Sequence, residues 1–210
     1  MNDEKMNKLL FVTGATQNSG LAIARHFAKH GYDIGISSRD KTKADAAAQS
    51  IAEEYKVKTA GYALNLADTR DIERVFAQIS NDFGRLDVFV PNSANLGVGY
   101  DIFNTTPEVF DEIMDVNVKG TFFCCQQAAL LMKKFGSGGS IVIMGSIQYL
   151  GAVRGRTTYS TSKGALASLT RNLAFELAED GIRVNYLVAG AIHTHRWDTQ
   201  APAETARRRA

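Results

Sequence analysis

Tyr159 and Lys163 lie four residues apart in the segment YSTSK, and Ser146 stands thirteen residues before Tyr159. On a helix, residues four apart share one face, so these two side chains are expected to point the same way. A phenol with a pKa near ~10 can protonate a developing alkoxide when a nearby ammonium stabilises the phenolate, lowering that pKa by about 1 to 3 units. The Ser146 hydroxyl would hydrogen-bond the same oxygen. The three residues therefore predict proton transfer during hydride addition to a carbonyl.

Asn117, in the segment MDVNVKGTF, is a fourth candidate. A buried amide in a helix could hold a water that passes protons to Lys163, and that is the role we expect for it. A Tyr-x-x-x-Lys pair alone is a weak signal, since such a pair arises often by chance. The prediction therefore depends on elements that bring Ser146 and Asn117 to the same edge of the fold.

Short apolar runs alternate with helical patterns along the chain. The runs are unalternating and rich in branched residues, as in strands buried on both faces; they are Leu9–Val12, Ile34–Ser37, Ala60–Leu64, Val88–Val90, Ile141–Met144 and Val184–Val188. Between them, apolar residues recur every three or four positions; helices are expected over 21–28, 44–55 and 72–83, from after Thr106 towards Phe135, and from about Thr158 to Asp180. This order predicts an α/β fold with a doubly wound parallel sheet, a Rossmann-type three-layer sandwich, in one domain over residues 1–210.

The loop after the first strand, TGATQNSG, leads directly into a helix. Glycines at this point let backbone N–H groups and the helix N-terminus face a pyrophosphate. Asn18 fits such a loop because asparagine accepts a positive φ. We therefore expect a dinucleotide phosphate site formed by Gly14, Thr16, Gln17, Asn18, Ser19 and Gly20.

The second strand ends in Ser37-Ser38-Arg39, where a dinucleotide fold meets the adenosine ribose. An acidic residue there would bind both ribose hydroxyls, whereas Arg39 offers a planar cation for a 2'-phosphate. Ser38 and Arg39 therefore predict NADP(H) as the cofactor. NAD stays open as the alternative, because Asp40 follows.

Five segments in this order resemble the short-chain dehydrogenase/reductase family, including members such as 3-oxoacyl carrier protein reductases. They are TGATQNSGLAIA, LDVFVPNSA, MDVNVKGTF, Ser146 with YSTSK, and IRVNYLVAGAIHT, and the resemblance covers roughly residues 8 to 195. It implies an enzyme that oxidises alcohols or reduces carbonyls, usually a homotetramer or homodimer paired through two long helices. It also implies cofactor contacts from Tyr159, Lys163, Asn65, Leu66, Asn92, Ser93, Ala94, Gly190 and Ile192.

The chain departs from the family pattern at several positions. The middle glycine of the first loop is Asn18, the usual Asn-Asn-Ala-Gly after the fourth strand is Pro91-Asn92-Ser93-Ala94, an Asp that meets the adenine is Asn65, and the Pro before Gly190 is Ala189. The family's last helix and seventh, edge strand have no counterpart in the sequence. We expect 191–210 to form only part of a substrate lid.

The mouth of the site is expected to hold polar and aromatic side chains: Asn95, Gln148, Tyr149, Arg154, Arg156, His193, His195 and Trp197. These residues would suit a sugar, a steroid or a small keto ester and do not choose between them. His193 and His195 have no third ligand nearby, so we expect no metal.

The bulk properties exclude several other classes of function. Formal net charge is +2 without a basic stripe, which argues against a nucleic-acid partner. Adjacent Cys124 and Cys125 suit neither a structural disulfide nor a metal site. No apolar run approaches the roughly 18 residues that span a bilayer, so a soluble cytoplasmic protein is expected.

Two other functions compete with an active oxidoreductase. A dinucleotide-binding sensor or regulator of the same fold would bind cofactor without catalysis, but it would not need Ser146, Tyr159 and Lys163 together. A nucleotide-sugar epimerase using the same tyrosine chemistry is disfavoured, because the short C-terminal region leaves little room for a second domain.

Overall fold

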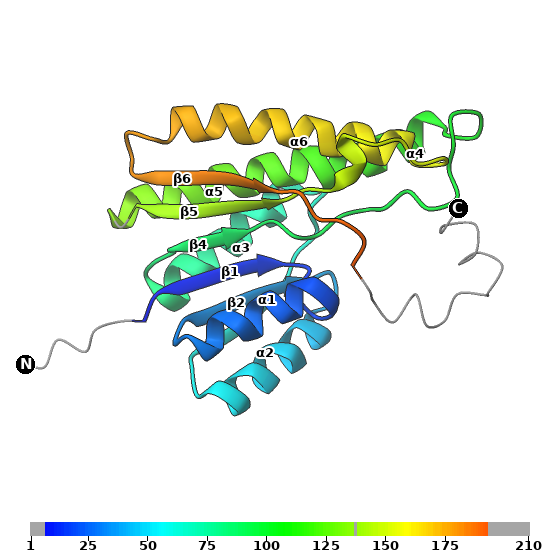
Figure 1. Ribbon diagram of the computed structural model, residues 1–210. Coiled ribbons are helices and arrows are strands. Elements are labelled where there is room, and N and C mark those ends of the chain that lie inside the picture. The colour runs from blue at the N-terminus through cyan, green and yellow to red at the C-terminus, as the bar shows by residue number, and fades with distance from the viewer. Residues whose placement is uncertain (1–6, 137, 193–210) are drawn as a thin grey trace, which may run out of the picture.

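A computed structural model describes residues 7–136 and 138–192 of the chain. Its centre is one parallel sheet with the strand order β3-β2-β1-β4-β5-β6 (Figure 1). The strands are β1 Leu9–Thr13, β2 Asp33–Ser38, β3 Thr59–Ala63, β4 Val88–Val90, β5 Gly139–Met144 and β6 Ile182–Leu187. The predicted six strands and doubly wound fold are confirmed. The order reverses between β1 and β4, where ligands of such sheets bind beyond the strand ends.

Helices pack on both faces of the sheet and create two apolar cores. They are α1 Asn18–Lys29, α2 Lys41–Tyr55, α3 Thr69–Phe83, α4 Pro107–Met114, α5 Gly120–Phe135 and α6 Thr157–Glu176. The first core lies under α1 and α2 and includes Val12 and Ile36. The second lies under α3, α5 and α6 and includes Phe11 and Leu166. Because both faces of β1 are covered, all five of its residues are buried and its sequence does not alternate.

The helix expected from Thr106 to Phe135 is interrupted by a π-helical turn. Thr106 caps α4 as predicted, accepting a hydrogen bond from the Val109 N–H at 3.4 Å, with Pro107 in the first turn. Between α4 and α5, residues Asp115–Lys119 form the π-helix. A π turn adds a residue to the helical repeat and changes which side chains face inward. The simple helical period did not predict this turn. It accompanies the burial of Asn117, which the sequence analysis expected as a buried amide.

α6 ends earlier than predicted. The helix stops at Glu176, and residues up to Gly181 continue as turns, with Gly181 at φ +69°. Within the described ranges the sheet ends at β6, whose Arg183, Asn185 and Leu187 are exposed. None of the described helices is long and apolar enough to cross a membrane.

Phe11 lies at the centre of the second core. Its ring packs 5.4 Å from Phe76 and 5.6 Å from Phe89, centroid to centroid, and its side chain is fully buried. Phe11→Ala is expected to lower the free energy of unfolding by about 3 to 5 kcal/mol, through lost burial and a cavity.

Urea denaturation followed by circular dichroism measures this loss. The matched control is Phe175→Ala on α6, since Phe175 is 85% exposed and its truncation should change the free energy of unfolding by about 0.5 kcal/mol or less. A loss below about 1 kcal/mol for Phe11→Ala would contradict the packing described.

Candidate active site

The loop between β1 and α1 has the backbone shape of a phosphate cradle. Gly14 has φ +64°, and Asn18 has φ +50°, as its residue type allows. A Cβ on Gly20 would lie 2.5 Å from the Gly14 carbonyl oxygen and 2.7 Å from Asn92 Nδ2. The close packing of these backbones therefore requires glycine at position 20.

Asn92 joins this loop to the end of β4. Its Nδ2 donates hydrogen bonds to the carbonyl oxygens of Thr13 and Gly14 at 3.1 and 3.2 Å, and its Oδ1 accepts one from Ser19 Oγ at 3.0 Å. Thr13 Oγ1 accepts from the N–H groups of Asn92 and Ser93 at 3.0 and 3.1 Å. These bonds cross the point where the strand order reverses, and they fix the shape of the cradle.

The N-terminus of α1 suits a phosphate group. Gln17, its N-cap, makes no side-chain hydrogen bond to the first turn. By contrast, Asp40 caps α2 and Asp68 caps α3 through their carboxylates. Since the first N–H groups of a helix need acceptors, a dinucleotide pyrophosphate fits this position. Thr16 and Ala94, two of the predicted cofactor contacts, are half-buried.

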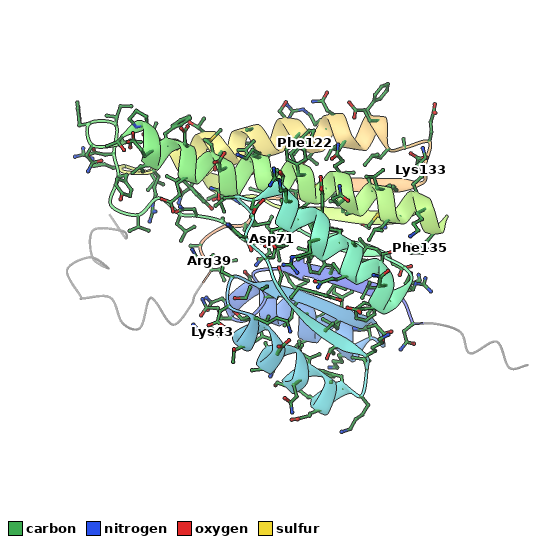
Figure 2. The ribbon with its side chains drawn as sticks, turned by 180° about the vertical axis from the view of Figure 1, so that it is seen from behind. Arg39, Lys43, Asp71, Phe122, Lys133 and Phe135 are labelled. Carbon is green, nitrogen blue, oxygen red and sulfur yellow. The ribbon has the colours of Figure 1, made fainter. Side chains whose placement is uncertain are left out.

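The adenosine end of the predicted cofactor site contains an exposed Arg39 after β2. Figure 2 shows Arg39 and Lys43 at the same edge of the molecule. Asp40 faces α2: its carboxylate accepts a hydrogen bond from the Lys43 N–H at 3.2 Å, which lowers the pKa of Asp40, and it pairs with Lys43 Nζ at 3.5 Å. The Asp40 N–H donates to Ser38 Oγ. The Asp40 carboxylate therefore caps the N-terminus of α2.

Asn65 and Leu66 follow β3, as the cofactor prediction requires. The Asn65 N–H donates to Asp71 Oδ2 at 2.7 Å, and Asn65 Oδ1 accepts from the Ala67 N–H at 3.2 Å. The buried Leu66 packs under the start of α5, where a Cβ on Gly120 would lie 2.5 Å from its carbonyl oxygen. Asn65 thus forms a local turn at the strand end.

Ser146, Tyr159 and Lys163 come together at the carboxyl end of β5. Ser146 lies two residues beyond β5, where it caps a short 3-10 turn, Ile147–Tyr149, and Tyr159 and Lys163 lie on the first turns of α6. The three residues are only 8%, 9% and 3% exposed. Lys163 Nζ lies 5.6 Å from the centroid of the Tyr159 ring. The spacing of the sequence therefore produces a buried cluster of hydroxyl, phenol and ammonium.

Burial shifts the pKa values of both titratable groups in this cluster. Burial raises the pKa of Tyr159, while a hydrogen bond with the Ser146 side chain and the charge of Arg156 act to lower it. Burial lowers the pKa of Lys163 to about 8. Lys163 Nζ donates a hydrogen bond to the Met144 carbonyl oxygen at 2.7 Å. The Lys163 ammonium and the Tyr159 ring therefore lie close together in the buried cluster, as the helical spacing predicts.

Asn117 connects the loop after β4 to α6. Its Oδ1 accepts from the Asn95 N–H at 2.7 Å, and its Nδ2 donates to the Asn95 carbonyl oxygen at 2.9 Å and to Ser162 Oγ at 3.0 Å. Ser162 Oγ in turn donates to the Tyr159 carbonyl oxygen at 2.7 Å. Both amide hydrogens of Asn117 are therefore used to hold protein groups.

Sequence reasoning did not single out Thr13 and Ser162, although both bind candidate residues. Each had a signal. Thr13 ends a buried strand directly before Gly14, and Ser162 lies between Tyr159 and Lys163 in the same helical turn. A small hydroxyl at either position can bond to nearby backbone groups, which is how both act here.

The mouth residues fall into three groups. Arg156 Nη1 donates to the Leu96 carbonyl oxygen at 2.6 Å, and Tyr149 packs edge-on against Tyr186 at 5.3 Å. Arg154 is exposed, while Asn95 and Gln148 are half-buried. The predicted cofactor contacts Gly190 and Ile192 are exposed as well. His193, His195 and Trp197 lie outside the described residues, as does most of the expected lid segment 191–210. Within the described ranges no three His, Cys, Asp or Glu side chains gather as metal ligands.

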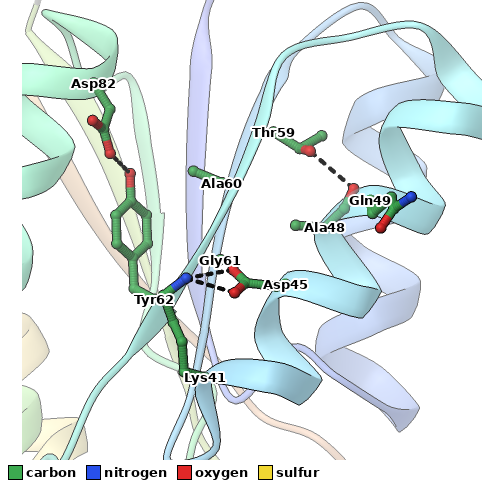
Figure 3. Close-up of a pocket in the computed structure, with 9 residues that line it drawn as sticks. All are labelled: Lys41, Asp45, Ala48, Gln49, Thr59, Ala60, Gly61, Tyr62 and Asp82. Atoms are coloured by element: carbon green, nitrogen blue, oxygen red, sulfur yellow. Dashed lines mark hydrogen bonds and ion pairs between the residues drawn. The ribbon is translucent and has the colours of Figure 1, made fainter.

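A separate hollow lies between α2 and the edge strand β3 (Figure 3). Its polar side chains bond to one another or to backbone. Tyr62 Oη donates to Asp82 at 2.7 Å, Lys41 pairs with Asp45 at 2.6 Å, and Thr59 Oγ1 donates to the Ala48 carbonyl oxygen at 2.9 Å. This hollow is distinct from the cluster around Tyr159 and offers no comparable chemistry.

Comparison with known proteins agrees with this geometry. A family model described as Enoyl-(Acyl carrier protein) reductase matches residues 14–209. Dehydrogenase/reductase SDR family member 4 from Oryctolagus cuniculus is 37% identical over 206 residues, which cover 96% of this chain and 78% of the relative.

Solved structures with the same fold hold dinucleotides. An NAD+-bound xylitol dehydrogenase aligns with a TM-score of 0.86 and 27% identity, over 94% of this chain and 76% of the other. A metagenomic short-chain oxidoreductase in complex with NADP aligns with a TM-score of 0.82 and 25% identity, over 89% and 84%. With the glycine loop, the buried Tyr159 and Lys163, and these matches, the chain belongs to the short-chain dehydrogenase/reductase family of NAD(P)-dependent oxidoreductases.

Proposed function

We propose that this protein transfers a hydride between NADP(H) and an alcohol or ketone, with Ser146, Tyr159 and Lys163 at the reacting centre. The observation that carries the proposal is the burial of these three side chains in one cluster beyond β5, on the same edge of the sheet as the glycine loop. The substrate's carbonyl or hydroxyl oxygen would meet Ser146 and Tyr159 there.

Each residue has a role that follows from its surroundings. The bound nicotinamide supplies or accepts the hydride. Ser146 Oγ donates a hydrogen bond to the substrate oxygen and orients it. In reduction, Tyr159 gives its phenolic proton to that oxygen, and in oxidation the phenolate takes the proton back.

Lys163 would hold the ribose hydroxyls of the nicotinamide end. Its pKa of about 8 means that the ammonium form dominates at neutral pH and is lost as the pH rises through 8. The Lys163 ammonium, 5.6 Å from the centroid of the Tyr159 ring, would stabilise the Tyr159 phenolate.

Arg39 supports NADP(H) as the physiological cofactor. Its guanidinium is exposed at the edge where the adenosine ribose would lie, and the neighbouring Asp40 carboxylate is occupied in capping α2. The acidic neighbour of Arg39 therefore has a partner in α2. Relatives with either dinucleotide share the fold, so the choice depends on such local residues.

Tyr159→Phe removes the proton donor while keeping the ring. Turnover of a ketone panel with NADPH is expected to fall by about 10²- to 10⁴-fold, with NADPH binding retained. The loss is measured by NADPH absorbance, and binding by nicotinamide fluorescence. The control is Tyr32→Phe, which removes the hydroxyl of a tyrosine outside the cluster. The Tyr32 ring packs against Phe27, next to α1. Unimpaired turnover in Tyr159→Phe would overturn the assignment, and tight binding without turnover in the wild type would indicate a sensor.

Arg39→Gln removes the cation proposed to bind the 2'-phosphate. Charged hydrogen bonds contribute about 1.5 to 3 kcal/mol, so the Kd for NADPH should rise about 10- to 100-fold while the Kd for NADH stays unchanged. Fluorescence titration with each dinucleotide measures both values. Arg183→Gln, on the exposed side of β6, serves as the charge-matched control. Equal effects of Arg39→Gln on both dinucleotides would contradict the NADP assignment.

A further inference from the structure

Two histidines lie side by side at the C-terminal end of α1. His26 is in the last turn of this helix and His30 is its C-cap, so the two are four residues apart and share one face. Both are exposed, and their ring centroids are 4.6 Å apart with an interplanar angle of 46°. Because α1 runs back from the glycine loop, the pair lies at the opposite edge of the sheet from the candidate active site (Figure 1).

A hydrogen bond fixes which nitrogen of the His30 ring carries the proton. Nδ1 of His30 lies 2.8 Å from the carbonyl oxygen of His26. A carbonyl oxygen only accepts hydrogen bonds, so Nδ1 is the donor, and Nε2 of the neutral ring keeps its lone pair. Histidines that bind metals are held in the same way, with one ring nitrogen donating to a carbonyl or carboxylate and the other coordinating the ion. His30 is therefore prepared to act as a metal ligand.

The spacing of the two rings suits the coordination of one cation. Zinc lies about 2.1 Å from a histidine nitrogen and arranges its ligands at roughly tetrahedral angles, so two imidazoles on one zinc have their centroids about 4.5 to 5 Å apart. The 4.6 Å between the rings of His26 and His30 falls in this range. The His26 ring also packs edge-on against Phe27 at 6.3 Å, which limits its movement. Little rearrangement is therefore needed for both rings to reach one ion.

The end of α1 also favours a cation electrostatically. The last carbonyl groups of a helix lack intrahelical partners and form the negative end of the helix dipole. This field acts against the repulsion from the exposed Lys29, which stands between the two histidines in the sequence. Imidazole nitrogens select ions such as Zn²⁺, Ni²⁺ and Cu²⁺, whereas Mg²⁺ and Ca²⁺ prefer oxygen ligands. The chemistry of the pair therefore specifies the class of ion.

We propose that His26 and His30 form a surface site for a divalent cation of this class, with Zn²⁺ as its occupant. One nitrogen from each ring coordinates the ion, and water completes its coordination. Within the described ranges no third His, Cys, Asp or Glu gathers with the pair, so the site is open and its Kd for zinc is on the order of 10 μM, far weaker than that of closed four-ligand sites. This site is independent of the proposed hydride transfer.

Zinc titration of the full chain, prepared without a histidine tag, tests the proposal. His26→Asn and His30→Asn each remove one ligand, and each should raise the Kd for zinc measured by isothermal titration calorimetry by at least about 10-fold. Circular dichroism checks that both variants stay folded. The matched control is Lys29→Gln, which changes an exposed side chain in the same turn without removing a ligand and should bind zinc at least as tightly as the wild type.

Nitrogen-15 NMR of the histidine rings locates the bound ion. Without zinc, His30 should carry its proton on Nδ1. With zinc, Nε2 of His30 and one ring nitrogen of His26 should shift together at the same zinc concentration, and each signal is assigned by its loss in the corresponding asparagine variant. An unchanged Kd in both variants, or zinc-induced shifts confined to His193 and His195, the other two histidines of the chain, would overturn the proposal.

Discussion

The side-chain hydrogen bonds of Asn117 are the interaction on which the arrangement of the site depends. Its amide bonds both backbone groups of Asn95 and the hydroxyl of Ser162, which bonds the backbone of Tyr159. Asn117 is 1% exposed, so these bonds lie in a low-dielectric interior. Removing the amide would leave buried partners unsatisfied, at a cost of about 1 to 3 kcal/mol for each group. The π turn accompanies the inward placement of this side chain.

The loop after β4 links the glycine loop to the first turn of α6. At one end, Asn92 is bonded to Thr13, Gly14 and Ser19 of the glycine loop. Three residues later, Asn95 is bonded to Asn117. The next residue, Leu96, receives the guanidinium of Arg156. One short loop makes all these contacts. A shift of the glycine loop would therefore also displace the first turn of α6.

The sequence was sufficient to predict the layout of the fold and the side chains that meet in the buried cluster beyond β5. Unalternating apolar strands and helical periods predicted a doubly wound sheet. Gly14 and Ser146 follow strands β1 and β5 at one edge of this sheet, and Tyr159 lies at the start of α6 beside Ser146. Asn18 takes the positive φ that its residue type permits. These features depend on local patterns and on the general rules of parallel sheets, which a single sequence carries.

The partners of individual polar groups were not predictable in the same way. The π turn, the donation by Lys163 to the Met144 carbonyl, and the turning of Asp40 towards α2 all depend on which backbone atoms the packed elements bring close. The sequence predicts Arg156 at the mouth of the site but not its contact with Leu96, which lies 60 positions away in sequence. Such contacts are set by tertiary packing and carry no periodic signal.

Hydride transfer at the Tyr159 cluster is the central claim, and isotope transfer tests it most directly. The protein would be incubated with NADPH carrying deuterium at both C4 positions of the nicotinamide and with a panel of small, sugar-like and steroid ketones. The account predicts that at least one product alcohol carries a single deuterium on its carbinol carbon, seen by mass spectrometry. Binding of the dinucleotide with no deuterium in any product would contradict it.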